Sequence, residues 1–182
     1  MGKKSENWSR YFLLECLALA IYMSAPFIDM YVNNGPPADT KPFSTFDDFY
    51  PFYLTQHADV TCRRLHFIGT SIVIFMALED IRIALSILPA GLLGMGLVKL
   101  LMHIPHGGFE MAALVSMFLS CSYSLTKDWR KGVSCILVGY AFAWVGHFFF
   151  EMNNPATFIY PTYSLLSDFK LWFEIASGIR EF

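Results

Sequence analysis

Long apolar stretches separated by short polar breaks dominate the pattern of this chain. A first stretch covers residues 11–32, and four more follow at about residues 66–78, 81–101, 109–125 and 133–150. An apolar helix needs about 20 residues to cross a bilayer, and closely spaced helices of this kind pack into membrane bundles. The pattern therefore predicts an all-α fold, an integral-membrane helical bundle with four core transmembrane segments.

The first apolar stretch, residues 11–32, predicts a further spanning or interfacial helix. Basic residues precede it, so a cleaved signal peptide is the alternative. Glu15 interrupts the apolar run, and residues 24–26 (Ser-Ala-Pro) form a poor cleavage site, which favours a helix that stays with the chain. A loop rich in Asn, Gly and Pro follows. We therefore place an N-terminal membrane segment and linker at residues 1–42.

The end of the chain is amphipathic. Apolar residues share one stripe at helical spacing, namely Leu165, Leu166, Phe169, Trp172, Phe173 and Ala176. Asp168 and other polar residues lie off this stripe. The pattern predicts an amphipathic helix lying at the bilayer interface, and an ordinary helix packed on the bundle is the alternative. The core domain is then residues 43–176, and residues 177–182 are a tail.

Composition narrows the class of protein. The chain has 182 residues, the length of one domain, with 55% apolar and only 15% charged residues. Soluble domains contain about a quarter charged residues, so this is neither an ordinary soluble globule nor a disordered chain. The net charge is −2 and basic blocks are absent from the sequence, which argues against nucleic-acid binding. Membrane lipids are the expected surroundings.

Five histidines are the main candidates for chemistry. They are His57, His66, His103, His106 and His147. If all four core segments cross the membrane, alternation of the breaks places all five near one face. Imidazole is poorly tolerated in lipid without a partner, so a metal ion or water could satisfy them. The plainer interpretation is that histidines prefer interfaces.

Two spacings test the metal interpretation. His57 and His66 are nine residues apart, so on one continuous helix their rings would point in opposite directions. They can share a site only if the chain bends between them, near residues 60–62. His147 and Glu151 are four apart and share a helix face. Such a donor set resembles that of a non-haem iron site, with zinc as the main competitor and a structural His–Glu hydrogen bond as the plain alternative.

Three further polar residues lie beside these histidines. Arg63 and Arg64 precede His66, where they could bind lipid headgroups or hold the carboxylate of a substrate. Asn153 follows Glu151 and is a further candidate for contact with substrate. Motifs for a serine hydrolase or for nucleotide binding are absent from the sequence.

At these motifs the sequence resembles a known membrane family, once described only as a domain of unknown function. The residues that carry the resemblance are Phe49-Tyr50-Pro51-Phe52-Tyr53-Leu54-Thr55-Gln56-His57, then Cys62-Arg63-Arg64-Leu65-His66-Phe67-Ile68-Gly69, then Gly146, His147, Glu151, Pro155 and Ala156. The resemblance covers about residues 43–176. The characterised fungal member of the family is an endoplasmic-reticulum 2-hydroxy fatty acid dioxygenase of phytosphingosine breakdown. That member has Asn where this chain has Cys62.

The resemblance implies an Fe(II)-dependent enzyme, with Fe(2+) as cofactor, in fatty acid α-oxidation and sphingolipid catabolism. A long-chain 2-hydroxy fatty acid and O2 would give CO2 and a fatty acid one carbon shorter. It also implies an endoplasmic-reticulum location and a metal site at His57, His66, His147 and Glu151. The alternatives are a non-catalytic membrane scaffold or lipid-binding protein, and a zinc-dependent lipid hydrolase that uses the same ligands.

Overall fold

The computed structural model describes residues 2–32 and 35–182, and this part of the chain is helical without strands. The α-helices are α1 (Gly2–Val32), α2 (Phe46–Thr55), α3 (Val60–Glu79), α4 (Ile81–Leu100), α5 (Gly108–Thr126), α6 (Trp129–Gly146) and α7 (Pro161–Ala176). A π-helical turn, η1 (His147–Glu151), continues α6, and a 3-10 turn, η2 (Ala156–Phe158), precedes α7. The predicted all-α fold is confirmed. Asn33 and Asn34 of the predicted linker lie outside the described residues.

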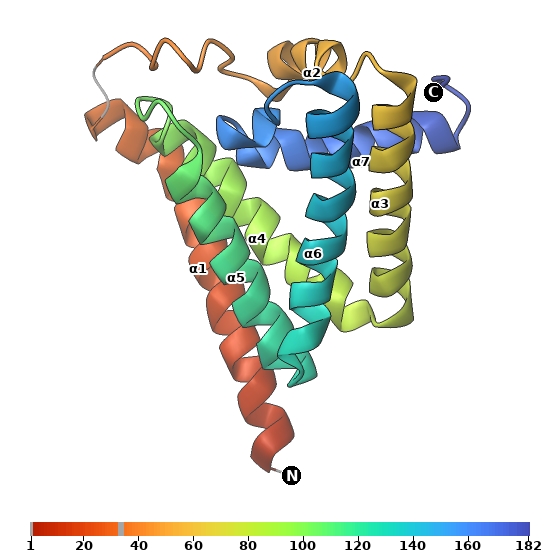
Figure 1. Ribbon diagram of the computed structural model, residues 1–182. Coiled ribbons are helices and arrows are strands. Elements are labelled where there is room, and N and C mark those ends of the chain that lie inside the picture. The colour runs from red at the N-terminus through yellow and green to blue at the C-terminus, as the bar shows by residue number, and fades with distance from the viewer. Residues whose placement is uncertain (1, 33–34) are drawn as a thin grey trace.

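Five of these helices are long and apolar enough to cross a membrane, namely α1, α3, α4, α5 and the combination of α6 with η1. They include all four predicted core segments and the N-terminal one. The four core helices run up and down in turn, and α2 lies across the end of the bundle where α3 begins and α6 finishes (Figure 1). That end also carries the α4–α5 loop (Figure 1). This is a membrane protein with one polar end rich in loops.

Helices α3 and α6 approach each other closely because small residues lie between them. A β-carbon on Gly69 of α3 would be 2.8 Å from the β-carbon of Phe142, and one on Gly146 of α6 would be 2.9 Å from the Cys62 sulfur. Small residues allow such approach in membrane bundles, where dispersion contacts replace the hydrophobic effect as the source of packing energy. These contacts fix the position of one end of α6 against the first turn of α3.

Helix α1 packs along α4 and α5 rather than standing apart. Tyr11 and Ala18 are buried in a cluster with residues of α4 and α5, and the Tyr11 hydroxyl donates to the Leu85 carbonyl oxygen at 2.8 Å. Gly96 of α4 lies against the backbone of Tyr22, where a β-carbon would be only 3.0 Å from the α-carbon. The predicted N-terminal membrane segment is therefore an integrated part of the bundle in this structure.

Helix α7 lies across the bundle near the α2 end (Figure 1). Its buried residues include Thr162, Ser164 and Ser167, whereas Phe173 of the apolar stripe is 59% exposed. The polar face therefore packs against the protein and much of the apolar stripe faces outward, as suits a helix at a lipid interface. Both alternatives expected from the sequence therefore describe part of α7. One of its faces packs on the bundle, and the other points outward as in an interfacial helix.

Candidate metal centre

A short turn brings the first two histidines together. Helix α2 ends at Thr55 and α3 begins at Val60, and the Asp59 side chain caps α3 by accepting from the backbone N–H groups of Thr61 and Cys62. The chain therefore bends between His57 and His66, as it must if two histidines nine residues apart are to share a site. Their ring centroids are 4.4 Å apart.

The third histidine comes from the end of α6. At His147 the α-helix gives way to the π-helical turn η1, which ends where Met152 adopts a left-handed backbone conformation (φ +54°). Single π turns within helices are frequent at functional sites. The ring of His147 lies 4.7 Å from that of His57 and 5.0 Å from that of His66, centroid to centroid. Three imidazoles from three segments thus form one cluster.

Each imidazole has an oxygen acceptor at its Nδ1. His57 Nδ1 lies 2.8 Å from the Tyr53 carbonyl oxygen, His66 Nδ1 lies 2.6 Å from Asp168 Oδ1, and His147 Nδ1 lies 2.7 Å from Asn153 Oδ1. The Asn153 amide is oriented by its NH2 group, which donates to the Gln56 carbonyl oxygen at 3.1 Å. Each Nδ1 therefore carries the proton and donates it. Each Nε2 is left with a free lone pair.

Two of these Nε2 atoms, those of His57 and His66, are buried without a hydrogen-bond partner. A buried polar atom left in this state is costly, and a histidine whose Nδ1–H is held by an acceptor is the usual form of a metal ligand. The Cys62 sulfur completes a group in which the ligand atoms of His57, Cys62 and His66 lie within 4.8 Å of one another. His57, Cys62 and His66 could therefore hold a metal ion, and the His147 ring lies beside them.

The electrostatics also suit metal binding. Burial, with a smaller contribution from the neighbouring His66, lowers the pKa of His57 to about 3. At neutral pH the His57 ring is consequently uncharged. A metal ion can then bind its Nε2 without displacing a proton.

Asp168 is the residue that the sequence analysis missed. Its carboxylate accepts from His66 Nδ1 at 2.6 Å and from the Tyr53 hydroxyl at 2.5 Å. Burial alone would raise the pKa of Asp168, but the facing His66 and the Tyr53 hydroxyl outweigh it and hold that pKa below its usual range. The available signal was its place on the polar face of α7, opposite the apolar stripe. This pattern placed Asp168 on the polar face of α7, but it did not show which residue Asp168 contacts.

The other predicted site residues have protein partners. Glu151 Oε1 accepts from the Asp59 backbone N–H at 2.5 Å. Asn153 accepts from His147 and donates to the Gln56 carbonyl oxygen. Arg63 donates to the carbonyl oxygens of His57 and Ala58. Arg64 lies over the ring of Phe182, 5.6 Å from its centroid. Most of these contacts fix the turn between α2 and α3.

His103 and His106 lie outside the cluster, in the loop between α4 and α5. His103 Nδ1 is 2.9 Å from the Pro36 carbonyl oxygen, and His106 Nδ1 accepts from the Gly108 backbone N–H. This loop is at the same end of the bundle as the cluster (Figure 1). The structure therefore brings three of the five histidines into one site.

Comparison with known proteins identifies the family. A family model described as 2-hydroxy-palmitic acid dioxygenase Mpo1-like matches residues 43–179, well over half of the chain. The match includes the three clustered histidines and Asp168, and it leaves α1 outside. Searches of curated proteins and of solved structures give no match. The chain therefore belongs to the Mpo1-like family, the family that its sequence motifs had indicated.

Proposed function

We propose that this protein is an Fe(II)-dependent dioxygenase of fatty acid α-oxidation. Its substrate is a long-chain 2-hydroxy fatty acid, which O2 converts to CO2 and a fatty acid one carbon shorter. The observation that carries the proposal is the pair of buried, unpartnered Nε2 atoms of His57 and His66, facing the same cluster as His147. The family description, a dioxygenase of 2-hydroxy-palmitic acid, supports the reaction.

We assign the metal ligands to His57, His66 and His147. Fe(II) bound there would supply the redox chemistry that allows O2 to react with an α-hydroxy acid. Asp168, Asn153 and the Tyr53 carbonyl oxygen keep the three protons on Nδ1, so that each Nε2 stays available.

Glu151 could serve either as a further ligand or as an acceptor that positions the site. Its hydrogen bond to the Asp59 N–H favours positioning, because that bond fixes the turn that carries His57. The protein then orients the metal and the substrate rather than supplying a nucleophile of its own.

The proposed reaction balances with O2 as the only co-substrate and without an added reductant. Conversion of a 2-hydroxy acid to CO2 and the next shorter acid removes four electrons, and reduction of O2 accepts four. One water is formed. The enzyme consequently needs no reductase partner for turnover. Its membrane helices suit a substrate that resides in lipid, and we propose the endoplasmic reticulum as its location.

The test is metal analysis and turnover on detergent-purified protein. Wild type, His66→Ala, His147→Ala and the control His106→Ala are reconstituted anaerobically with Fe(II) and then given 2-hydroxypalmitic acid and O2. We expect near-stoichiometric iron and pentadecanoic acid in wild type and in His106→Ala. We expect both to be lost in the two cluster variants.

The other outcomes separate the alternatives. Hydrolysis of an ester lipid that needs zinc and proceeds without O2 would establish the hydrolase instead. A folded wild-type protein that binds neither iron nor zinc would overturn the catalytic proposal and leave a scaffold or lipid-binding protein.

A further inference from the structure

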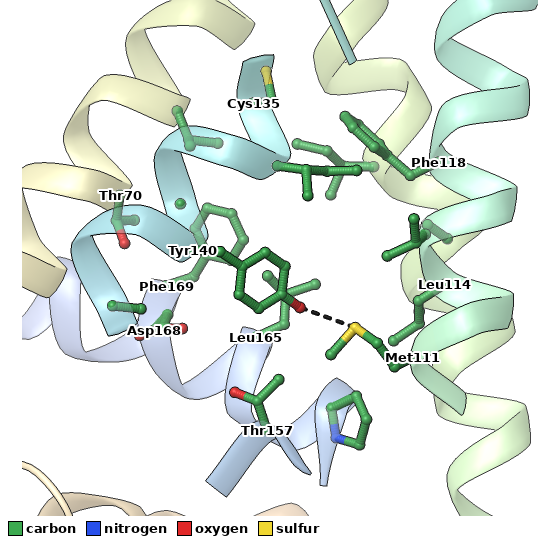
Figure 2. Close-up of a pocket in the computed structure, with 18 of the residues that line it drawn as sticks. Thr70, Met111, Leu114, Phe118, Cys135, Tyr140, Thr157, Leu165, Asp168 and Phe169 are labelled. Carbon is green, nitrogen blue, oxygen red and sulfur yellow. Dashed lines mark hydrogen bonds between the residues drawn. The ribbon is translucent and has the colours of Figure 1, made fainter. Parts of the chain in front are cut away.

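An apolar cavity of about 180 Å3 lies inside the bundle, beside the histidine cluster. Helices α3, α4, α5, α6 and α7 all contribute to its wall. The side chains that face it are mostly hydrocarbon, as Figure 2 shows. Tyr140 reaches across it, and its hydroxyl is engaged with the Met111 sulfur at 2.9 Å. The cavity therefore offers few free polar groups to a ligand.

The cavity is elongated along the helices. On α6 its wall runs from Cys135 through Gly139 to Trp144, and on α5 from Met111 to Phe118. Nine residues of helix rise about 13 Å, so the space extends over more than two helical turns. A slot of this shape suits an extended hydrocarbon chain better than a compact ring system.

The two ends of the cavity differ in chemistry. His66 and Asp168 line one end, where the cavity meets the metal centre. Ile83, Phe118 and Cys135 line the other end, and Ile83 and Cys135 are buried there. In Figure 2, Cys135 and Phe118 stand on the opposite side of Tyr140 from Asp168 and Thr157. One end is thus polar and next to the cluster, and the other is apolar.

We propose that this cavity is the binding slot for the hydrocarbon chain of the fatty acid substrate. The headgroup lies at His66 and Asp168, and the middle of the chain lies against Phe118 and Cys135. This inference rests on the proposed function for the identity of the headgroup. The slot would direct the polar end of a substrate drawn from lipid to the metal centre, because His66 and Asp168 lie at one end of the space and the rest of its wall is mostly apolar.

We further propose that Gly139 controls the length of chain that the slot accepts. Gly139 lines the cavity midway along α6, and a β-carbon there would meet only the Val73 side chain, at an ordinary contact distance of 3.9 Å. A larger side chain at this position is therefore tolerated by the backbone and projects into the slot. Because a chain in lipid is already in an apolar medium, shape rather than hydrophobicity sets the selectivity.

The location of the chain is tested by photo-crosslinking on the metal-free protein. The probe is palmitic acid with a diazirine at the middle of its chain, and mass spectrometry maps the labelled residues. We expect labels on Phe118, Cys135 and their neighbours, and competition by unlabelled 2-hydroxypalmitic acid. Labels confined to outward-facing residues, or equal labelling by a phospholipid carrying the same diazirine, would overturn the slot.

The length control is tested with Gly139→Leu against Gly91→Leu, a matched change at a glycine of α4 whose β-carbon would meet open space. We expect Gly139→Leu to lower kcat/KM for 2-hydroxypalmitic acid relative to 2-hydroxyoctanoic acid by roughly tenfold or more, the scale of overpacking a closely packed site. Gly91→Leu should keep the wild-type ratio. An unchanged ratio in an active, folded Gly139→Leu protein would contradict the assignment.

The two proposals fail separately. Labels in the slot without any turnover would support the chain-binding slot and contradict the proposed dioxygenase reaction. Turnover with labels outside the slot would retain the reaction and reject the slot.

Discussion

At the scale of single residues, the site depends on three different acceptors for three equivalent protons. A backbone carbonyl, a carboxylate and a side-chain amide hold the Nδ1 protons of His57, His66 and His147. The carboxylate is the strongest acceptor of the three, because it carries a charge. The orientation of the His66 ring should therefore depend more strongly on its partner than those of His57 and His147.

Replacing Asp168 tests this dependence. We expect Asp168→Ala to weaken Fe(II) binding by about 10- to 100-fold, the usual cost of losing such a partner, because His66 can then turn or change tautomer. Asp168→Asn, which keeps a neutral oxygen acceptor, should lose less. Titration of the metal-free proteins with Fe(II) measures both, with Asp47→Asn at an exposed carboxylate of α2 as control. Equal Fe(II) affinity in wild type and the three variants would show that Asp168 does not support metal binding.

At the scale of elements, the close contact between α3 and α6 places the first two histidines against the third. The contact depends on Gly146, which immediately precedes His147 and lies against Cys62. A change in the distance between these helices therefore moves His147 relative to His66 without altering a ligand.

We expect Gly146→Ala to destabilise the protein by about 1–3 kcal/mol and to weaken Fe(II) binding, since its β-carbon would lie 2.9 Å from the Cys62 sulfur. Gly139→Ala on the same helix, with a nearest contact of 3.9 Å, serves as the matched control. Thermal unfolding in detergent and Fe(II) titration measure the two effects. The double variant Cys62→Ala with Gly146→Ala should recover part of the stability, and a further loss in it would contradict the packing explanation.

The opposite end of the bundle provides a pH-dependent contact between elements. Asp80, between α3 and α4, accepts from the Arg82 guanidinium at 2.7 and 2.8 Å and from Lys131 of α6 at 2.5 Å. The hydrogen bonds from Arg82, followed by that from Lys131, hold the pKa of Asp80 below its usual range. Its contribution to stability is therefore complete above the unfolded-state pKa of about 4 and is lost as the pH falls towards the lowered folded-state value.

We accordingly expect Asp80→Asn to lower Tm at pH 7 by about 2–4 °C, on the basis of roughly 1 kcal/mol for this ion-paired group. The difference in Tm between variant and wild type should shrink as the pH is lowered below about 4. Thermal unfolding across a pH series measures it. A difference that grew on acidification would show that the charge of Asp80 does not stabilise the fold.

The sequence predicted some features of the fold and of the candidate site, but not others. The apolar stretches predicted the four core helices, because crossing a bilayer imposes a length and a composition that are visible in one dimension. The spacing of His57 and His66 showed that a bend was required, and the turn at Asp59 provides it. Asp168 escaped notice because its partner is about a hundred residues away, and a helical stripe indicates which residues share a face but not what that face contacts. Asn153 was expected to meet substrate, and in the structure it orients an imidazole.

At the scale of the whole molecule, the number of crossings determines where the two ends of the chain lie. Within the described residues, five helices are long and apolar enough to span a membrane, and α7 lies across the bundle near the end where α3 begins and α6 finishes (Figure 1). If all five cross, the N-terminus and the histidine cluster lie on opposite sides of the membrane. The C-terminus then lies on the same side as the histidine cluster.

We expect a protease-sensitive tag at the N-terminus and one at the C-terminus to be cleaved from opposite sides of sealed membrane vesicles. Digestion before and after permeabilisation, followed by blotting for each tag, measures this. A tag in the α4–α5 loop should behave like the C-terminal tag. Cleavage of both terminal tags from one side would mean that one of the five helices does not cross.

The acidic partner of His66 lies on α7, 102 residues further along the chain, so the site is complete only when distant parts of the chain have packed together. A chain folded only as far as η1 would hold the three imidazoles without the carboxylate that accepts from His66. We expect a metal ion at the proposed site to bind with full affinity only once α7 has docked. Metal binding would then report that the whole bundle has assembled.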